Sequence, residues 1–306
     1  MWFKNLVVYR LPADWAVTAA ELEEKLATRT LQPCSPFEML SRGWVAPSGT
    51  GRLVHTVNQQ HLIALGANQK LLPASIIRQV TLERAEALAQ ENGFPVGRRQ
   101  MRDLKMRVTE ELRAKALTRR RITRAWIDPI NGWLVVDAAG AAKAEELIET
   151  LRDTLGSLAV LFVETERSPQ MSMAVWLKLG EAPLRLTIDQ DLELKAATNQ
   201  SKATIRYSHH PLEGKEIQAH MAAGMYPTRL GLTWNDRIAF VLNEKMQIKR
   251  VEFLEMSKDA ADGGDLNEAD QFDIDFTVMA GELAKLLDDV VSALGTPEVQ
   301  QQAAAA

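Results

Sequence analysis

Cationic side chains crowd one stretch of an otherwise acidic chain. Residues 98–124 contain eleven arginines and lysines against three acids, which gives this basic block a net charge of +8. The whole chain of 306 residues has 36 basic and 40 acidic side chains, a net charge of −4. A field this concentrated attracts polyanions, and nucleic acid is the commonest polyanion in a cell. The eleven cations are Arg98, Arg99, Arg102, Lys105, Arg107, Arg113, Lys115, Arg119, Arg120, Arg121 and Arg124.

Two other interpretations of the basic block compete with phosphate binding. A solvated helix surface with salt bridges four residues apart needs matching acids, and the block has only Asp103, Glu110 and Glu111. A membrane-surface helix needs a broad apolar face, whereas Met101 and Leu104 fit packing between two helices. Arginine favours phosphate because its planar fork pairs with phosphate oxygens. The block therefore predicts contact with a nucleic-acid backbone.

The opposite pole of the chain is acidic. Residues 252–306 contain thirteen acids against Lys258 and Lys285, a net charge of −11. A protein with two such poles should bind DNA with one face only. We expect the acidic pole to point away from the DNA.

One pattern points to an enzyme instead. Asp189, Glu193 and Lys195 resemble the set with which some nucleases hold Mg²⁺ and orient the attacking water. A strand with an alternating polar face explains the same residues, and three closely spaced charges specify little. The sequence thus favours a binding protein that is not an enzyme, with a Mg²⁺-dependent nuclease as the alternative.

No metal or cofactor is expected. The five histidines lack ligand spacing, no phosphate-binding glycine loop is present, and no nucleophile elbow is found. The only cysteine, Cys34, excludes an intrachain disulfide and fits the reducing cytosol. The sequence shows neither a signal peptide nor a membrane span, so we expect a cytoplasmic protein without a membrane partner.

Two amphipathic helices should carry most of these cations. Residues 75–90 and about 99–117 each show an apolar stripe at helical spacing. Asn92, Gly93 and Pro95 separate them, since glycine ends helices and proline cannot continue them. The pattern predicts a helical hairpin that projects from the β-rich sequence around it.

The surrounding sequence predicts an α+β fold. Two β-type runs, 122–128 and 133–137, enclose a Pro/Asn/Gly turn that is typical of a β-hairpin. A helix at 141–155 and a strand at 158–164 follow, and residues 228–254 indicate an antiparallel meander. Further strands are expected at 3–11, 52–57, 61–65, 184–194 and 202–207, and further helices from Thr18 onward, at 169–179, 211–223 and 273–294, with an acidic loop at 257–270. We expect antiparallel-sheet modules with packed helices.

A series of short motifs, in order and over nearly the whole chain, resembles the recombination-associated protein RdgC family. No one motif decides the matter, but the ordered series is specific. The motifs are Trp2-Phe3-Lys4-Asn5-Leu6 with Val8-Tyr9-Arg10-Leu11, Gly43-Trp44-Val45 with Pro47, Lys70-Leu71-Leu72-Pro73, Trp126-Ile127-Asp128 with Asn131-Gly132, Leu155-Gly156-Ser157-Leu158, Glu216-Ile217-Gln218 and Met279-Ala280-Gly281-Glu282-Leu283.

The resemblance implies a homodimer closed into a ring around duplex DNA. It implies sequence-independent binding to double-stranded DNA, weaker binding to single-stranded DNA, association with the nucleoid and antagonism of the RecA recombinase. It also implies three modules: a central α+β domain at 1–74 and 118–167, a helical tip at 75–117 and a β-rich base at 168–299. Residues 300–306 would form a flexible tail.

The resemblance also assigns roles to individual residues. The family's basic–Ala–hydrophobic step at the tip looks like Lys115-Ala116-Leu117, which makes Leu117 a dimer contact. A polar pair in the base aligns with His209 and His210. The DNA-binding residues expected from the block and this pair are Arg98, Arg99, Arg102, Lys105, Arg113, Lys115, Arg119, Arg120, Arg121, Arg124, His209 and His210.

Overall fold

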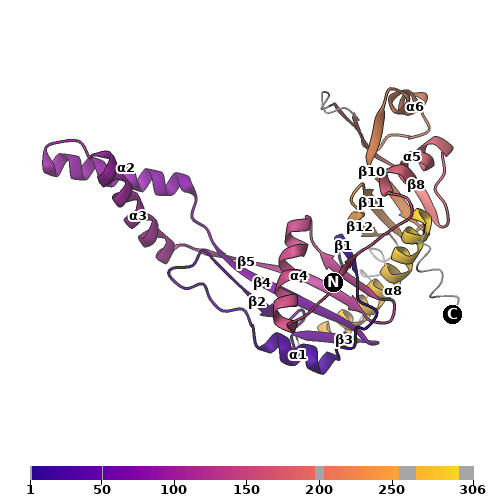
Figure 1. The fold of residues 1–306 in the computed structure, drawn as a ribbon, viewed down its shortest axis with the longest axis horizontal. Helices are drawn as coiled ribbons and strands as arrows, with labels where there is room; N and C mark the ends of the chain where they lie inside the picture. The colour runs from indigo at the N-terminus through magenta and orange to yellow at the C-terminus, as the bar shows by residue number, and fades with distance from the viewer. Residues whose placement is uncertain (1, 50, 197–202, 255–266, 296–306) are drawn as a thin grey trace.

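One large antiparallel sheet organises the chain (Figure 1). The computed structural model describes residues 2–49, 51–196, 203–254 and 267–295, so most of the expected acidic loop and the whole expected tail lie outside the described residues. The twelve strands follow the order β2-β4-β5-β6-β1-β12-β11-β10-β8-β9, while β3 pairs with β4 and β7 pairs with β1. Helices pack on the sheet, which confirms the predicted α+β class.

The strands and helices have the following bounds. The strands are β1 (Asn5–Arg10), β2 (Leu40–Val45), β3 (Val54–Val57), β4 (Gln60–Lys70), β5 (Thr118–Asp128), β6 (Trp133–Asp137), β7 (Leu161–Phe162), β8 (Leu186–Ala196), β9 (Thr204–Tyr207), β10 (Met225–Trp234), β11 (Ile238–Asn243) and β12 (Gln247–Phe253). The helices are α1 (Ala19–Ala27), α2 (Ala74–Asn92), α3 (Arg98–Lys115), α4 (Ala141–Leu155), α5 (Pro169–Leu179), α6 (Lys215–Ala222) and α8 (Glu268–Leu294).

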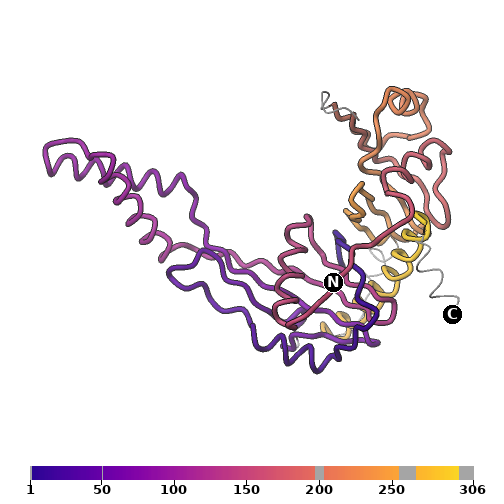
Figure 2. Tube along the Cα trace, viewed as in Figure 1, coloured from indigo at the N-terminus to yellow at the C-terminus, as the bar shows by residue number. Residues whose placement is uncertain are grey.

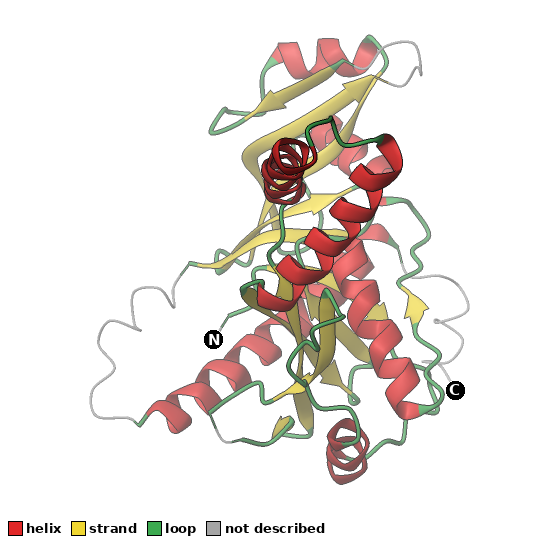
Figure 3. Cartoon of the chain, turned by 90° about the vertical axis from the view of Figure 1, so that its left-hand side faces the viewer, coloured by secondary structure: helices red, strands yellow, loops and turns green. Residues whose placement is uncertain are grey.

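The two faces of the sheet support two separate cores. Side chains alternate along a strand, so neighbours on β5 point to opposite faces. Ile127 packs in the α1/α4 core with Leu22 and Leu147, whereas Trp126 packs in the α8 core with Phe276. Figure 3, viewed from the side of α2 and α3, shows helices on both flanks of the sheet.

The sheet runs without interruption from the N-terminal to the C-terminal half of the chain. β1 pairs with β6 on one side and with β12 on the other. On the β12 side, Asn5 lies opposite Lys249 and Val7 opposite Gln247. Backbone hydrogen bonding therefore crosses the boundary expected near residue 168, and the proposed division into modules stays a prediction.

α2 and α3 extend away from the sheet as a helical arm (Figures 1 and 2). The arm has a core of its own, in which Ala85, Leu104 and Val108 are the buried apolar residues. Gly93 ends α2 with a φ of +77°, the left-handed conformation that glycine adopts without strain. β4 leads into the arm and β5 leads out of it, since Lys70 pairs with Thr118.

Several strands differ from the sequence prediction. The sequence pattern did not predict β2, which includes Gly43. β2 packs against residues 29–31, and its Trp44 donates its N–H to the carbonyl of Arg29. The strand expected at 158–164 shortens to β7, because Leu158 is buried in the α1/α4 core. β5 starts four residues before the predicted 122, so Arg119, Arg120 and Arg121 lie on a strand.

Candidate nucleic-acid interface

α3 presents a stripe of cations along one side of the helical arm. Arg98, Arg102, Lys105 and Arg113 recur at intervals of four, three and eight residues, which keeps them on one helix face. Arg102, Lys105 and Arg113 line the same shallow groove. At a rise of 1.5 Å per residue, the stripe spans about 22 Å, several phosphates of a DNA backbone.

Few carboxylates neutralise the basic block. Glu111 Oε1 lies 3.0 Å from Lys115 Nζ, and its Oε2 lies 2.8 Å from Arg84 Nη2 on α2. These hydrogen bonds from Arg84 and Lys115 hold the pKa of Glu111 below its ordinary value. Within the described ranges, no other cation of the block forms an ion pair. A surface of compensating salt bridges therefore does not account for the block.

The four arginines of β5 divide between the two faces of the sheet. Arg119 and Arg121 share the face of Ile127, while Arg120 and Arg124 share the face of Trp126. Arg120 donates from Nε to Asn68 Oδ1 at 3.2 Å. The Nε atom of Arg124 is buried and has no hydrogen-bond partner among the described residues. Cations of the basic block therefore lie on both faces of β5, the strand that connects the arm to the sheet.

Leu117 lies where α3 joins β5, at the root of the arm and not at its far end. Its side chain is 79% exposed. Its carbonyl accepts a hydrogen bond from the N–H of Leu71, whose side chain is also exposed. An apolar side chain this exposed costs free energy in water and is available for contact with another surface.

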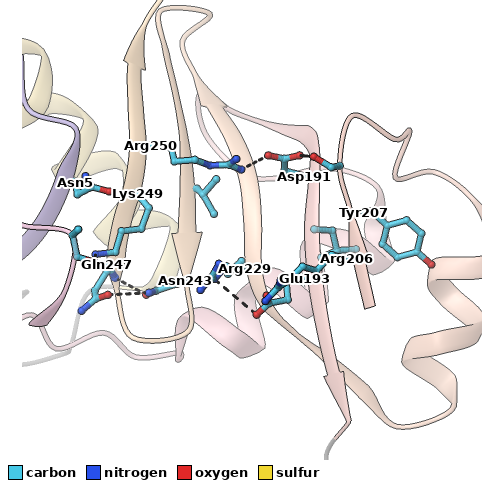
Figure 4. Close-up of a pocket in the computed structure, with 14 residues that line it drawn as sticks. Asn5, Asp191, Glu193, Arg206, Tyr207, Arg229, Asn243, Gln247, Lys249 and Arg250 are labelled. Atoms are coloured by element: carbon cyan, nitrogen blue, oxygen red, sulfur yellow. Dashed lines mark hydrogen bonds and ion pairs between the residues drawn. The ribbon is translucent and has the colours of Figure 1, made fainter. Parts of the chain in front are cut away.

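A second group of cations lines a cavity of about 500 Å³ on β8–β12 (Figure 4). Its charged side chains are Arg206, Arg229, Lys249, Arg250, Asp191 and Glu193. The cavity lies on the sheet face opposite the α8 core, since Leu230, Leu242 and Ile248 on the same strands point into that core. Sequence reasoning did not single out these four cations as a site.

The register places this cavity on the sheet face that also carries Arg121. Lys249 lies opposite Asn5 of β1, and Val7 shares the face of Asn5. Val7 and Ala125 both pack in the α1/α4 core, and Arg121 precedes Ala125 by four residues on β5. One continuous, twisted face therefore carries cations at both ends, with α1 and α4 between them.

The histidine pair lies beside the cavity. His209 and His210 are exposed and lie just after β9, separated from it by Ser208. The His210 ring is 5.4 Å from the ring of Tyr207, which lines the cavity. The N–H of His209 donates to Asp191 Oδ1 at 3.4 Å.

The three residues of the nuclease alternative are not gathered around one point. Glu193 is buried and its carboxylate is held by Lys195 at 3.5 Å and by Arg206 at 2.7 Å. Asp189 is exposed, does not line the cavity, and accepts a hydrogen bond from the N–H of Gln190. In the part of the chain that the structure describes, no group of three His, Cys, Asp or Glu side chains could hold a metal ion.

Comparison with known proteins identifies the family to which this chain belongs. A family model described as "Putative exonuclease, RdgC" matches residues 1–297. This chain belongs to the RdgC family. It is 48% identical over 303 residues to the recombination-associated protein RdgC of Dechloromonas aromatica (strain RCB), covering 98% of this chain and 99% of the relative.

Two further relatives carry the same name. The recombination-associated protein RdgC of Herminiimonas arsenicoxydans is 46% identical over 301 residues, which is 98% of this chain and 100% of the relative. That of Janthinobacterium sp. (strain Marseille) is 46% identical over 295 residues, 96% and 98% of the two chains. The RdgC family membership predicted from the motif series is therefore confirmed.

The cavity cations of this RdgC-family chain were missed for a physical reason. No run of charged residues marks this site in the sequence, because Arg206, Arg229 and Lys249 are spread over more than 40 residues. Antiparallel pairing alone brings them together, because Glu193 lies opposite both Arg206 and Arg229. The signal available in the sequence was weak: one outward cation on each of several alternating strands.

No helix among the described residues is both long and apolar enough to cross a bilayer.

Proposed function

We propose that this RdgC-family protein binds double-stranded DNA through its phosphates, without reading sequence, and single-stranded DNA more weakly. The basic block carries this proposal, since ten of its eleven cations have no carboxylate partner among the described residues. Uncompensated like charges on one helix repel each other, and a bound polyanion removes that cost. Phosphate contacts position a protein on DNA but carry no base information.

Salt dependence tests this function directly. Fluorescence anisotropy with duplexes of unrelated sequence should give similar Kd values at each salt concentration. If about five phosphates are neutralised, log affinity should fall with log salt at a slope of about −4 to −5. A slope near −1, or a strong preference for one sequence, would contradict the proposal.

We further propose that two copies close into a ring around the duplex and thereby antagonise RecA in the nucleoid. The relatives are named recombination-associated proteins, and occupied DNA is unavailable to a recombinase. The arm and the β8–β10 end of the sheet both point to the same side of the molecule and leave that side open between them (Figure 2). A second copy that met this one along the helical arms, with Leu117 at the root of each arm in the contact, and through the base domains would close that side.

Replacing Leu117 by aspartate should weaken self-association at least about 100-fold. The substitution removes the burial of one leucine on each copy, and burying a leucine is worth about 1.5–3 kcal/mol. Sedimentation over a dilution series measures the dimer dissociation constant. Ile130→Asp is the matched control, because Ile130 is 64% exposed in the β5–β6 turn, away from the arm. Equal dissociation constants for both variants and the parent would exclude Leu117 from the contact.

We propose that binding occurs without hydrolysis, although the family description favours a nuclease as the second candidate. That candidate would use Asp189, Glu193 and Lys195 with Mg²⁺. The existing partners of the Glu193 carboxylate leave it little capacity to bind a metal ion. Nicking of supercoiled plasmid in Mg²⁺ that disappears in Glu193→Gln would instead support hydrolysis.

A further inference from the structure

A buried carboxylate lies beneath the cavity cations. The Glu193 side chain is only 4% exposed, whereas those of Arg206 and Arg229 are 72% and 58% exposed. Arg206 Nε lies 2.7 Å from Glu193 Oε2, and Arg229 Nε lies 3.8 Å from Oε1. Thr228 Oγ1 donates to Oε1 at 2.8 Å, and Lys195 Nζ lies 3.5 Å away. These hydrogen bonds and charges outweigh burial and keep the pKa of Glu193 below its ordinary value, so it stays an anion.

The carboxylate orients the two arginines without using up their capacity to bind an anion. Both approach Glu193 through Nε, and neither forms a hydrogen bond through its Nη amino groups within the described residues. Each guanidinium thus keeps the two-pronged end that pairs with phosphate oxygens. The exposed outer part of each side chain lines the cavity (Figure 4).

A β-bulge adds two more cations to the same cavity. Between the pairs Val241↔Lys249 and Ala239↔Glu252, β12 contains one residue more than β11, and Arg250 has a φ of +52°. A bulge re-aims a side chain, and here both Lys249 and Arg250 line the cavity. Arg250 pairs with Asp191, and Lys249 donates to the carbonyl of Ala139 at 3.0 Å.

The charges in the cavity do not balance. Four cations face two carboxylates, Asp191 and Glu193, which leaves a net charge of +2. Burial and the nearby Arg229 lower the pKa of Lys249, as expected where positive charge accumulates without a counterion. A bound anion would relieve this repulsion.

We propose that this cavity is a second phosphate-binding site for the DNA backbone and that Glu193 is its positioning residue. The inference rests on the proposed function and extends it from the basic block to the opposite end of the same sheet face. Glu193 would act through Arg206 and Arg229 and would not touch the DNA. The carboxylate that the sequence offered as a metal ligand would thus serve to hold cations in place.

The direction in which Glu193→Gln changes the affinity for DNA distinguishes this positioning role from simple electrostatics. Glu193→Gln removes a negative charge from the interface, so charge alone predicts tighter binding. Loss of positioning predicts about fivefold weaker binding, because two flexible, solvent-screened arginines lose their orientation. It also predicts that the slope of log affinity against log salt becomes shallower by the contribution of about one to two phosphate contacts. A purely structural role would not change this slope.

The arginines themselves provide a variant that leaves the buried carboxylate in place. Arg206→Gln combined with Arg229→Gln should weaken binding of a short duplex by about 25-fold near 0.15 M salt, through loss of two phosphate contacts. Adding Glu193→Gln to that pair should then have little further effect, because both arginines through which Glu193 acts are already gone. Glu282→Gln is the matched control: Glu282 is 14% exposed and holds Arg237 and Lys285, but lies on α8 at the opposite face of the sheet.

The outcomes separate this site from the proposed function. The proposed site would be overturned by tighter DNA binding of Glu193→Gln, or by parent-like binding of the folded Arg206/Arg229 double variant. Weaker binding after changes in the basic block would still leave the proposed function intact. Loss of Mg²⁺-dependent plasmid nicking in Glu193→Gln would make Glu193 catalytic and overturn its positioning role. If Glu193→Gln does not fold by circular dichroism, the double-arginine variant and its salt slope decide.

Discussion

Replacing Arg119, Arg120 and Arg121 by glutamine is expected to weaken binding to every duplex by the same factor, about 25-fold near 0.15 M salt. Two phosphate contacts are lost, because Arg119 and Arg121 share one face of β5 whereas Arg120 lies on the other. The reason is counterion release: each neutralised phosphate contributes roughly a factor of five at this salt concentration. All three side chains are exposed and none forms an ion pair with a described residue. Anisotropy titrations with several duplexes at several salt concentrations measure both the factor and a slope shallower by about 1.8.

The control for this variant removes the same charge elsewhere. Arg167, Arg185 and Arg237 changed together to glutamine lower the net charge equally, and Arg185 and Arg237 pair with acids of α8. This control should weaken binding only slightly, because exposed charges farther than about 10 Å from the DNA are largely screened. Equal losses in both triple variants would show that net charge and not contact matters. Parent-like binding in both would clear the β5 arginines of the role.

Gly43→Ala is expected to lower the free energy of unfolding by about 3 kcal/mol, in the range of an overpacked core. A Cβ atom at this position would lie 2.4 Å from Leu31 N and 2.5 Å from Leu31 Cα, which are backbone atoms that cannot rotate away. Residues 29–31 are held there because Leu31 donates its N–H to the carbonyl of Trp44 and Thr30 bridges Trp44. Urea unfolding followed by circular dichroism measures the change.

Gly281→Ala provides a comparison of opposite sign. Gly281 lies inside α8, and a Cβ atom there would meet nothing within 4 Å. Alanine loses less backbone entropy than glycine in a helix, so the variant should gain roughly 0.5–1 kcal/mol. If Gly43→Ala and Gly281→Ala unfold at the same urea concentration, the close approach of residues 29–31 to β2 is not a constraint in solution.

Local signals predicted the elements well. α4 and α5 have the predicted bounds, because Gly156 and Gly180 mark the ends of these helices. β2 escaped prediction because its glycine is a poor strand residue that only the crossing of residues 29–31 requires. Likewise, no local pattern distinguishes Arg119 from Arg120, although β5 directs them to opposite faces.

The amino-acid sequence by itself determined the charge of the basic block, the helices and hairpins that carry it, and membership in the RdgC family, because each depends on residues near one another in the chain or on an ordered series of motifs. Only the tertiary structure decided that Arg206, Arg229, Lys249 and Arg250 share a cavity, and that the Glu193 carboxylate is enclosed by cations. Strand register and a single bulge bring these distant residues together, and hydrogen bonding between strands is set by the packing of the whole sheet and not by any one segment.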